Sequence, residues 1–524
     1  MKKILFALIV LAGLASCSGG DNDPRLVIIT FDGLRWQEVF TGVDSFLVGN
    51  PDYVRNPEEL KAKYWRDTPE ERRQVLMPFI WSYGAENGFL VGNRNKGSQM
   101  QVANTKNYSY PGYSEMFCGW ADDERVNSNN PVPNPNKSVL EVANADPRYK
   151  DKVMLYASWE SIRYAVNNER GGFPGSVAYE PNVTRNQSPV LQLLDEMQEG
   201  MFHYWGSERF DSYTYAYALE TLKKDHPKVL YVGFGDTDEW AHAGKYDEYV
   251  RAANYTDIFI RRIVETCESD PFYKGKTTYM LTCDHGRGYR GNFTGHGAGT
   301  RGSENTWFIT FGKGIEKLGE TSNNGPYYTQ QFAATIAKVL GLDFTPDNGV
   351  KQEPIDPNYK GEPLVEFVPQ TDFGKISAVK DAKPKGKGVS FTYHEGQVKS
   401  VDELKDLPVL DNGTMPNFSF NRAKVDEYFG FQYKTLLKIS QAGKYTFYLT
   451  TDDGGKMWID GKLVINNDGS HGSNTEEAFM DLEAGYHRIE VKYFQKTQGK
   501  TLELAWQGPG FGEQVVPDDV LFAE

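Results

Sequence analysis

Apolar runs that end in an aspartate are the feature that most constrains how this chain can fold. The clearest is Thr277–Thr282, a β-branched and aromatic run followed by Cys283, Asp284, His285 and Gly286. This composition is typical of a buried parallel strand. Ligands bind at the carboxyl ends of strands in open α/β sheets, so the Asp-His pair indicates half of a metal site. Because many strands also end in Asp-His-Gly as a plain turn, the pair needs support from elsewhere.

Two further strand-like runs supply that support. Leu26–Phe31 is followed by Asp32 and Gly33, and Val229–Phe234 is followed by the acidic segment Gly235–Gly244. Asp32 is therefore a second candidate ligand. The repetition of one pattern at three strand ends favours a shared metal site over three unrelated turns.

The acidic segment pairs a carboxylate with an imidazole. Asp238 and His242 stand four residues apart, a spacing that puts both side chains on one face of a helical turn. Asp236 is an alternative to Asp238, and a solvated helix start capped by an aspartate is the non-functional interpretation. A third imidazole, His296, lies in the glycine-rich segment 286–297. Single loop histidines usually lie on the surface, so His296 is a candidate only as a member of this set.

The segment Thr105–Gly119 is the candidate source of a nucleophile. Pro111 fits the first turn of a helix, which would place the Ser109 hydroxyl where N–H groups and the helix dipole favour an anion. Such a position suits a phosphate. The alternative is that Ser109 only caps the helix, as most serines before a helix do.

Residues 1–17 predict a signal peptide, with Lys2 and Lys3 ahead of the apolar run Ile4–Leu14. This run is too short to span a membrane in the mature protein. The ending Leu14-Ala15-Ser16-Cys17 resembles the lipobox of bacterial lipoproteins, which implies cleavage before Cys17 and diacylation of its sulfur. Ordinary secretion is the alternative. We therefore expect a membrane tether through Cys17 in the bacterial cell envelope, on the periplasmic face or the outer surface of the outer membrane.

Length and charge limit the remaining classes. A chain of 524 residues favours roughly three domain-sized units, or one large enzyme and a smaller module. The net charge of −14 argues against nucleic acid or an anionic membrane surface as the partner. Cys118, Cys267 and Cys283 are an odd number, so the chain is not a disulfide scaffold. A single Cys267–Cys283 bridge stays open, although a small buried core residue describes Cys283 better.

Several helices are predicted around these motifs. Pro57–Gly88 is expected to be a helical insertion, with Thr68 as the N-cap and Pro69 at its first position. The segment Tyr246–Cys267 is also predicted helical, and so is Tyr328–Leu340, which Gly341 would end.

Taken in order, the motifs resemble those of the alkaline phosphatase superfamily, in particular its nucleotide pyrophosphatase/phosphodiesterase and phosphoglycerate-mutase-like branches. They are Asp32, Ser109 before Tyr110-Pro111, Asp238 with His242, Thr282–Gly286, and Gly295-His296. The resemblance implies an α/β domain over residues 25–345, with a mostly parallel sheet flanked by helices.

The resemblance also implies two zinc ions, or other divalent metals. Asp238, His242 and His296 would hold one ion, and Asp32, Asp284, His285 and the Ser109 oxygen the other. Three carboxylates and one alkoxide would balance the charge of two divalent ions. Ser109 would be the nucleophile, forming a phosphoseryl intermediate that water hydrolyses.

Two candidate phosphate ligands follow from the same resemblance. Asn130 lies 21 residues after Ser109, where relatives place a phosphate-binding asparagine, although Asn127 and Asn129 leave the register open. Similar phosphomonoesterases carry a Lys-x-Arg clamp, for which only Arg163 is available here.

The incomplete Lys-x-Arg clamp favours a phosphodiesterase or nucleotide pyrophosphatase over a monoesterase. The sulfatase branch is disfavoured, because Ser109–Tyr113 lacks the Pro and Arg positions of the Cys/Ser-x-Pro-x-Arg motif.

The composition changes after the expected catalytic domain. Residues 346–388 are rich in Pro, Lys, Asp and Gly and predict a linker, whereas residues 389–524 predict an all-β domain. Its Asp460-Gly461 pair is a hairpin signal. With Thr451–Gly455 and Leu482–His487, this region resembles a PA14 β-sandwich.

In sugar-binding PA14 relatives a pair of aspartates holds calcium that coordinates glycan hydroxyls. Asp452 and Asp453 are therefore candidate calcium ligands, and a simple tight turn is an equal alternative.

Together these patterns predict a membrane-tethered binuclear-metal hydrolase that acts on a phosphoester of a small molecule or of a glycan. A phosphomonoesterase of the same superfamily is one alternative. The other is a glycan-binding surface lipoprotein with a degenerate catalytic domain, against which the intact ligand set argues.

Overall fold

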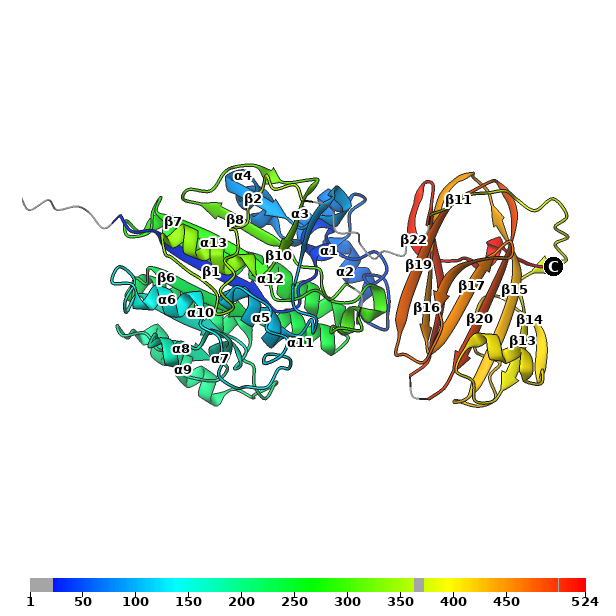
Figure 1. Cartoon of the computed structure of the whole chain (residues 1–524), viewed down its shortest axis with the longest axis horizontal. Helices are drawn as coiled ribbons and strands as arrows, with labels where there is room; N and C mark the ends of the chain where they lie inside the picture. The colour runs from blue at the N-terminus through cyan, green and yellow to red at the C-terminus, as the bar shows by residue number, and fades with distance from the viewer. Residues whose placement is uncertain (1–21, 301, 362–371, 498) are drawn as a thin grey trace, which may run out of the picture.

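The computed structural model describes residues 22–300, 302–361, 372–497 and 499–524 of the chain. It contains an α/β domain followed by an all-β domain (Figure 1). The expected signal peptide and Cys17 lie outside the described residues.

The α/β domain is built on one eight-stranded sheet of order β5-β4-β6-β1-β7-β8-β2-β9. In that order the strands are β5 (Gly175–Val177), β4 (Val153–Ala157), β6 (Val229–Phe234), β1 (Arg25–Phe31), β7 (Thr277–Cys283), β8 (Phe308–Gly312), β2 (Gly88–Val91) and β9 (Gly319–Glu320). Neighbours from β5 to β7 are parallel, and β8 runs antiparallel to both β7 and β2. The sheet is therefore mixed, and its parallel half matches the prediction.

The register of the three central strands decides where the site forms. Phe31 at the end of β1 pairs with Phe234 of β6 and with Cys283 of β7. The three strands thus end at one level. Asp32 and Asp284 follow at the same edge of the sheet, as expected for parallel neighbours.

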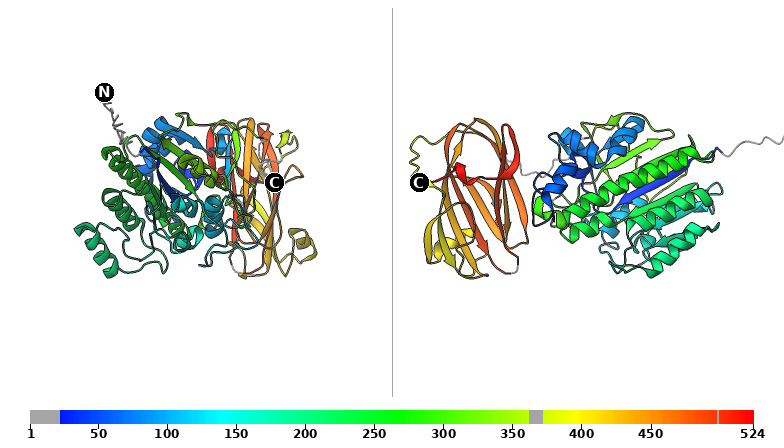
Figure 2. Two further views of the ribbon diagram at one scale, coloured as in Figure 1. Left: turned by 60° about the vertical axis from the view of Figure 1, so that its left-hand side comes forward. Right: turned by 180° about the vertical axis from the view of Figure 1, so that it is seen from behind.

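Both faces of the sheet are buried, which explains the unbroken apolar strand sequences. Val27 and Ile29 of β1 point into the core shared with helix α12 (Tyr246–Ser269), whereas Leu26 and Ile28 point into the opposite core. That second core includes residues of helices α5 (Ser109–Cys118) and α13 (Gln331–Leu340). Figure 2 shows helices against both faces of the sheet.

The local helix signals are largely confirmed. Helix α3 (Pro69–Leu76) begins with a capping box between Thr68 and Glu71, and α13 ends at Gly341 in the left-handed conformation. The other helices are α1 (Trp36–Thr41), α2 (Pro57–Tyr64), α4 (Ala85–Asn87), α6 (Val139–Ala145), α7 (Ile162–Val166), α8 (Asn168–Gly171), α9 (Pro189–Gly200), α10 (Asp211–Lys224) and α11 (Asp236–His242). Cys118, Cys267 and Cys283 are buried free thiols, so the Cys267–Cys283 bridge does not form.

The prediction of one linker over residues 346–388 was wrong at both ends. Ile355 is buried in the α/β core, where its N–H donates to Thr335 Oγ1 at 2.9 Å, and Gly325 forms a β-bridge with Lys360. On the other side, Asp372–Ile376 already pairs with the all-β domain. Ile355, the Tyr359 ring against Tyr327, and hydrogen bonds to both backbone and side chains of the first domain anchor this stretch. None of these contacts produces a periodic pattern in the sequence.

The all-β domain consists of two mostly antiparallel sheets around one core. One has the order β11 (Asp372–Ile376), β19 (Asn474–Leu482), β16 (Gly443–Asp452), β21 (Thr501–Gly508) and β22 (Phe511–Val515). The other has the order β12 (Gly386–Lys387), β23 (Leu521–Ala523), β15 (Phe429–Ile439), β20 (Gly485–Gln495), β17 (Gly454–Ile459) and β18 (Lys462–Asn467), with β13 (Val389–Glu395) paired to β15 and to β14 (Asp411–Met415). The hairpin at Asp460-Gly461 forms as predicted, with positive φ at both residues.

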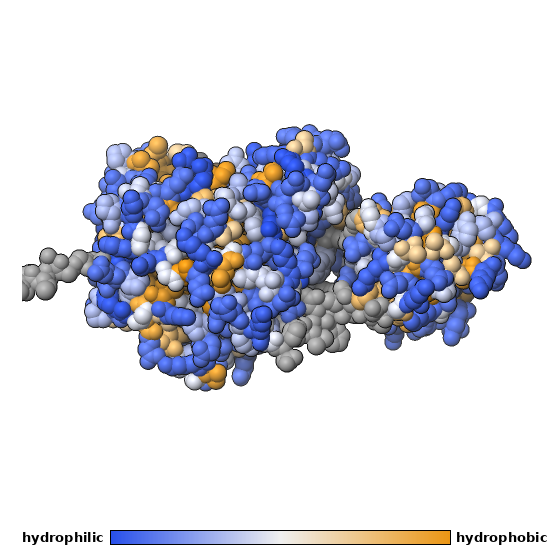
Figure 3. Space-filling view, turned by 90° about the horizontal axis from the view of Figure 1, so that it is seen from above, coloured by the Kyte–Doolittle hydropathy of each residue, from blue (hydrophilic) through white to orange (hydrophobic). Residues whose placement is uncertain are grey.

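Apolar side chains are scattered among polar ones on the face shown in Figure 3. Within the described part of the chain, no helix combines the length and apolar character needed to cross a bilayer.

One close contact in this fold generates a stability prediction. A Cβ at Gly112 in α5 would lie 2.4 Å from the backbone oxygen of Asp284, so Gly112→Ala must push α5 away from the end of β7. We expect a loss of about 1–3 kcal/mol in the free energy of unfolding, measured with urea. Gly200→Ala in α9, where nothing lies within 4 Å, is the matched control and should be neutral or stabilising. Equal stability of the two variants would contradict the contact.

Candidate metal centre and nucleophile

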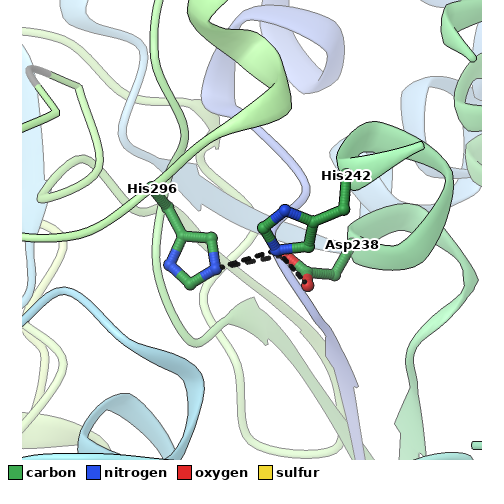
Figure 4. A group of neighbouring side chains, drawn as sticks. All are labelled: Asp238, His242 and His296. Carbon is green, nitrogen blue, oxygen red and sulfur yellow. Dashed lines mark hydrogen bonds and ion pairs between the residues drawn. The ribbon is translucent and has the colours of Figure 1, made fainter. Parts of the chain in front are cut away.

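The first candidate metal group consists of Asp238 and His242 on α11 and His296 from the loop after β7. His242 Nε2 lies 3.1 Å from Asp238 Oδ2 and 3.1 Å from His296 Nε2 (Figure 4). His296 Nε2 is 3.8 Å from Asp238 Oδ1. The helical spacing thus does place the Asp and His side chains together. Asp236, the alternative, instead accepts the backbone N–H of Asp211 at 3.0 Å.

The second candidate metal group surrounds Ser109. Its Oγ lies 3.2 Å from Asp32 Oδ1 and 3.1 Å from His285 Nε2. That same nitrogen is 3.4 Å from Asp32 Oδ1 and 3.4 Å from Asp284 Oδ2. The structure therefore gathers the four residues that the sequence assigned to one site.

Asp238 stands between the two groups. Its Oδ1 lies 3.9 Å from His285 Nε2, and Asp32, Asp238 and His285 have ligand atoms within 4.8 Å of one another. The two groups are thus adjacent, as a binuclear centre requires.

The donor atoms fit divalent metals. His285 Nδ1 is 2.7 Å from the Gly286 carbonyl, and His296 Nδ1 is 2.9 Å from the Asn107 carbonyl. Because a carbonyl only accepts, each Nδ1 carries the hydrogen and each Nε2 presents a lone pair to the site. Asp284 Oδ2 is buried and has no hydrogen-bond partner among the described residues. Imidazole nitrogens and carboxylate oxygens of this kind suit zinc.

Burial dominates the electrostatics of the site. Burial, and then the charge of Asp238, raises the pKa of Asp32 to about 7. Burial and the nearby Asp32 also raise the pKa of Asp284 well above its ordinary value. Burial lowers the pKa of His285 to about 4 and, together with His285, that of His296 to about 3. Both histidines are therefore neutral, and a metal would have to displace a proton from the carboxyls.

Ser109 is the first residue of α5 and does not cap it. The N-cap is Tyr108, which makes no side-chain capping bond. The Ser109 side chain is buried and points to Asp32 and His285. The capping interpretation of Ser109 is therefore wrong.

The two candidate phosphate ligands are placed differently from the expectation. Asn130 is exposed, and Asn129 is the residue whose Oδ1 accepts the Tyr110 N–H at the start of α5, at 2.9 Å. Asn129 is exposed as well, so a phosphate-binding asparagine in this segment stays a prediction. Arg163 pairs with Glu180 at 2.8 Å and with Glu169 at 3.5 Å, so two carboxylates already compensate its charge. Sequence position could not reveal these partners.

Arg287 is a site residue that the sequence motifs did not predict. Its guanidinium is fully buried and pairs with Asp238 Oδ1. The available signal was an arginine between two glycines, in the loop that connects His285 with His296.

In the all-β domain, Asp453 is buried and its Oδ2 accepts the Lys496 N–H at 2.6 Å. Asp452 is half-buried, and burial followed by the charge of Asp453 raises its pKa. Among the described residues, neither belongs to a group of three acidic, His or Cys ligands. Calcium at this pair stays a prediction, because calcium also takes carbonyl and water oxygens.

Comparison with known families supports both domain assignments. Residues 208–341 match the metalloenzyme superfamily, and residues 405–520 match the PA14 domain. The first match includes Asp238, His242, Asp284, His285 and His296. Asp32 and Ser109 lie outside it and are added by the geometry.

Individual relatives are distant. The anti-sigma-I factor RsgI3 of Acetivibrio thermocellus is 32% identical over 79 residues, which are 15% of this chain and only 12% of that protein's length. A protein of the alkaline phosphatase superfamily from Vibrio parahaemolyticus is 14% identical, with a TM-score of 0.40 over 62% of this chain and 69% of its own. The PA14 sugar-binding domain of an RTX adhesin is 16% identical, with a TM-score of 0.24 over 26% of this chain and 99% of its own.

The raised carboxyl pKa values predict that zinc and protons compete for the site. Since Asp32 in the metal-free chain titrates near pH 7, zinc binding below that pH must displace its proton. We expect the affinity for zinc to fall by up to about tenfold per pH unit as the pH drops below 7. Chelator-competition titrations across this range measure the effect. An affinity independent of pH would contradict the ligand role of the buried carboxyls.

Proposed function

Because the chain carries an alkaline-phosphatase-like metalloenzyme domain and a PA14 domain, we propose that it is a binuclear-metal hydrolase of phosphoesters with Ser109 as the nucleophile. The observation that supports this most is the position of Ser109. Its Oγ touches both Asp32 and His285, two members of the same candidate metal group. A serine that served only the fold would have no reason to face metal-type ligands.

The chain's own residues account for orientation and covalent chemistry. A lone pair on His285 Nε2 or Asp32 Oδ1 accepts the Ser109 hydrogen and fixes the direction of Oγ. Oγ attacks phosphorus as the bond to the leaving alcohol breaks, and that alcohol takes up a proton. Water then attacks the phosphoserine, releasing the phosphate product and restoring the hydroxyl. Two divalent metals, when bound, would supply the Lewis-acid charge that lowers the pKa of the serine hydroxyl and stabilises the transition state.

The surrounding charge favours a diester as the substrate. Arg163 is compensated by its own carboxylate partners. A monoester dianion needs additional fixed cations on its outer oxygens, whereas a diester brings one negative charge fewer.

Few of the aromatic residues near the nucleophile are able to contact the second ester group of a diester. Tyr110 and Tyr113 are buried, and so cannot pack against a second ester group. Trp159, 6.3 Å from the Tyr113 ring, is only partly buried and is the remaining candidate. The proposed diester preference therefore depends on charge.

Model substrates test the reaction and the ester type together. We expect a higher kcat/KM for bis-(p-nitrophenyl) phosphate than for p-nitrophenyl phosphate, and little turnover of p-nitrophenyl sulfate. Ser109→Ala should lower kcat by about 1,000-fold or more. Ser114→Ala is the control on the same helix, because that hydroxyl accepts from Asn134 Nδ2 at 2.8 Å and faces the fold.

Each contrary result has a specific meaning. A clear preference for the monoester would assign a phosphatase, and a preference for the sulfate ester a sulfatase. Near wild-type turnover by Ser109→Ala would remove its role as nucleophile.

For the second domain we propose glycan capture, supported by the PA14 match. If Asp452 and Asp453 hold calcium, glycan binding should require calcium and should be lost in Asp452→Asn. Glycan-array binding by the full chain, with and without calcium, measures this. The absence of binding in calcium would make the domain a structural module.

A further inference from the structure

Arg287 is fully buried beside the first metal group. Its Nη1 pairs with Asp238 Oδ1, its Nε donates to the Phe293 carbonyl, and its Nη2 donates to the Thr294 carbonyl at 2.7 Å. Nη2 also lies 3.3 Å from His242 Nδ1. The three nitrogens of one planar group thus contact two separate segments of the chain.

Those two segments deliver all three ligands of the first metal group. Asp238 and His242 come from α11, and Thr294 stands two residues before His296. By holding the Phe293 and Thr294 carbonyls while pairing with Asp238, the guanidinium fixes the loop of one ligand against the helix of the other two. Lysine, with a single point of charge, cannot reproduce this fork.

The backbone around Asp238 makes room for this pair. A Cβ at Gly33 would lie 2.6 Å from Asp238 Oδ1 and 2.8 Å from Arg287 Nη1, and Gly33 has a φ of +60°. The residue after Asp32 is therefore a glycine for two reasons, its conformation and the space that the Arg287–Asp238 pair occupies.

The guanidinium also compensates the charge of Asp238, because its Nη1 pairs with Asp238 Oδ1.

The contact with His242 behaves differently from the others. Arg287 can only donate, so it favours the His242 tautomer with hydrogen on Nε2, toward Asp238. Metal binding through Nε2 requires the other tautomer. This contact, the longest of the four, must therefore open on metal loading, while those with Asp238 and the two carbonyls are compatible with it.

We propose that Arg287 is the positioning residue of the first metal group, which deepens the proposed function and rests on it. Two effects of opposite sign are expected. As a cation, Arg287 opposes the binding of another cation, whereas its hydrogen bonds preassemble Asp238 with the His296 loop. Loss of outer partners that orient metal ligands commonly weakens metal binding about 10- to 100-fold, so the orienting effect should dominate.

The test measures zinc stoichiometry by elemental analysis and zinc affinity by chelator competition on the full chain. We expect two tightly held ions in the wild type. In both Arg287→Gln and Arg287→Lys, one ion should bind about 10- to 100-fold more weakly and the other unchanged. His242→Ala removes a ligand of the first metal group and so identifies which ion is affected. Adding Arg287→Gln to this variant should cause no further loss of zinc affinity.

Arg73→Gln is the matched control. That arginine is also largely buried and makes a two-pronged pair with Glu320, at 2.8 and 3.1 Å, away from the candidate ligands. It should lower stability without changing zinc binding.

Unchanged or tighter zinc binding in a folded Arg287→Gln variant would overturn the inference. Arg287 would then affect zinc binding only through its charge and not by orienting the ligands. Wild-type affinity in Arg287→Lys would overturn it equally, and this variant decides if the Gln variant fails to fold. A folded wild type that binds no zinc after reconstitution would instead remove the proposed function, and the inference with it.

Discussion

The parallel alignment of β6, β1 and β7 forces carboxylates to share one buried edge, and the site depends on this. Asp32 and Asp284 are almost completely buried, and their pKa values are raised by that burial and by neighbouring charge. Left alone, such a cluster is unfavourable, because each charge loses its hydration and repels the others. The arrangement is therefore suited to hold cations.

Residues of the protein itself compensate part of this negative charge. Arg287 supplies one fixed positive charge beside Asp238, and the neutral His285 and His296 add lone pairs without adding charge. Asp32 contacts Ser109 Oγ directly, and Asp284 contacts His285, which also contacts that oxygen. These two carboxyls add negative charge once they lose their protons. Divalent metals would complete the balance and at the same time act on the nucleophile.

Close packing converts this electrostatic arrangement into a defined geometry. Helix α5 approaches the end of β7 so closely that position 112 has no room for a side chain. Ser109, one turn earlier on this helix, is thereby placed within hydrogen-bond distance of Asp32 and His285. The nucleophile is thus positioned by a backbone contact as much as by its own hydrogen bonds.

The sequence by itself determined the parts that depend on local pattern. Strand composition, the aspartates at strand ends, the spacing of Asp238 and His242 and the capping box at Thr68 are all encoded within a few residues. The common edge of parallel strands predicted that the strand-end aspartates lie close together, and the resemblance to a family implied the two ligand groups.

Only the tertiary structure decided which charges meet across the chain. Arg163 is engaged by Glu180, Asn129 rather than Asn130 reaches α5, and residues around Ile355 pack on the first domain. Arg287 pairs with Asp238, 49 residues earlier in the chain. Such pairings depend on the relative placement of separate elements, which no local period or propensity records, and they determine which cations are free to meet a substrate.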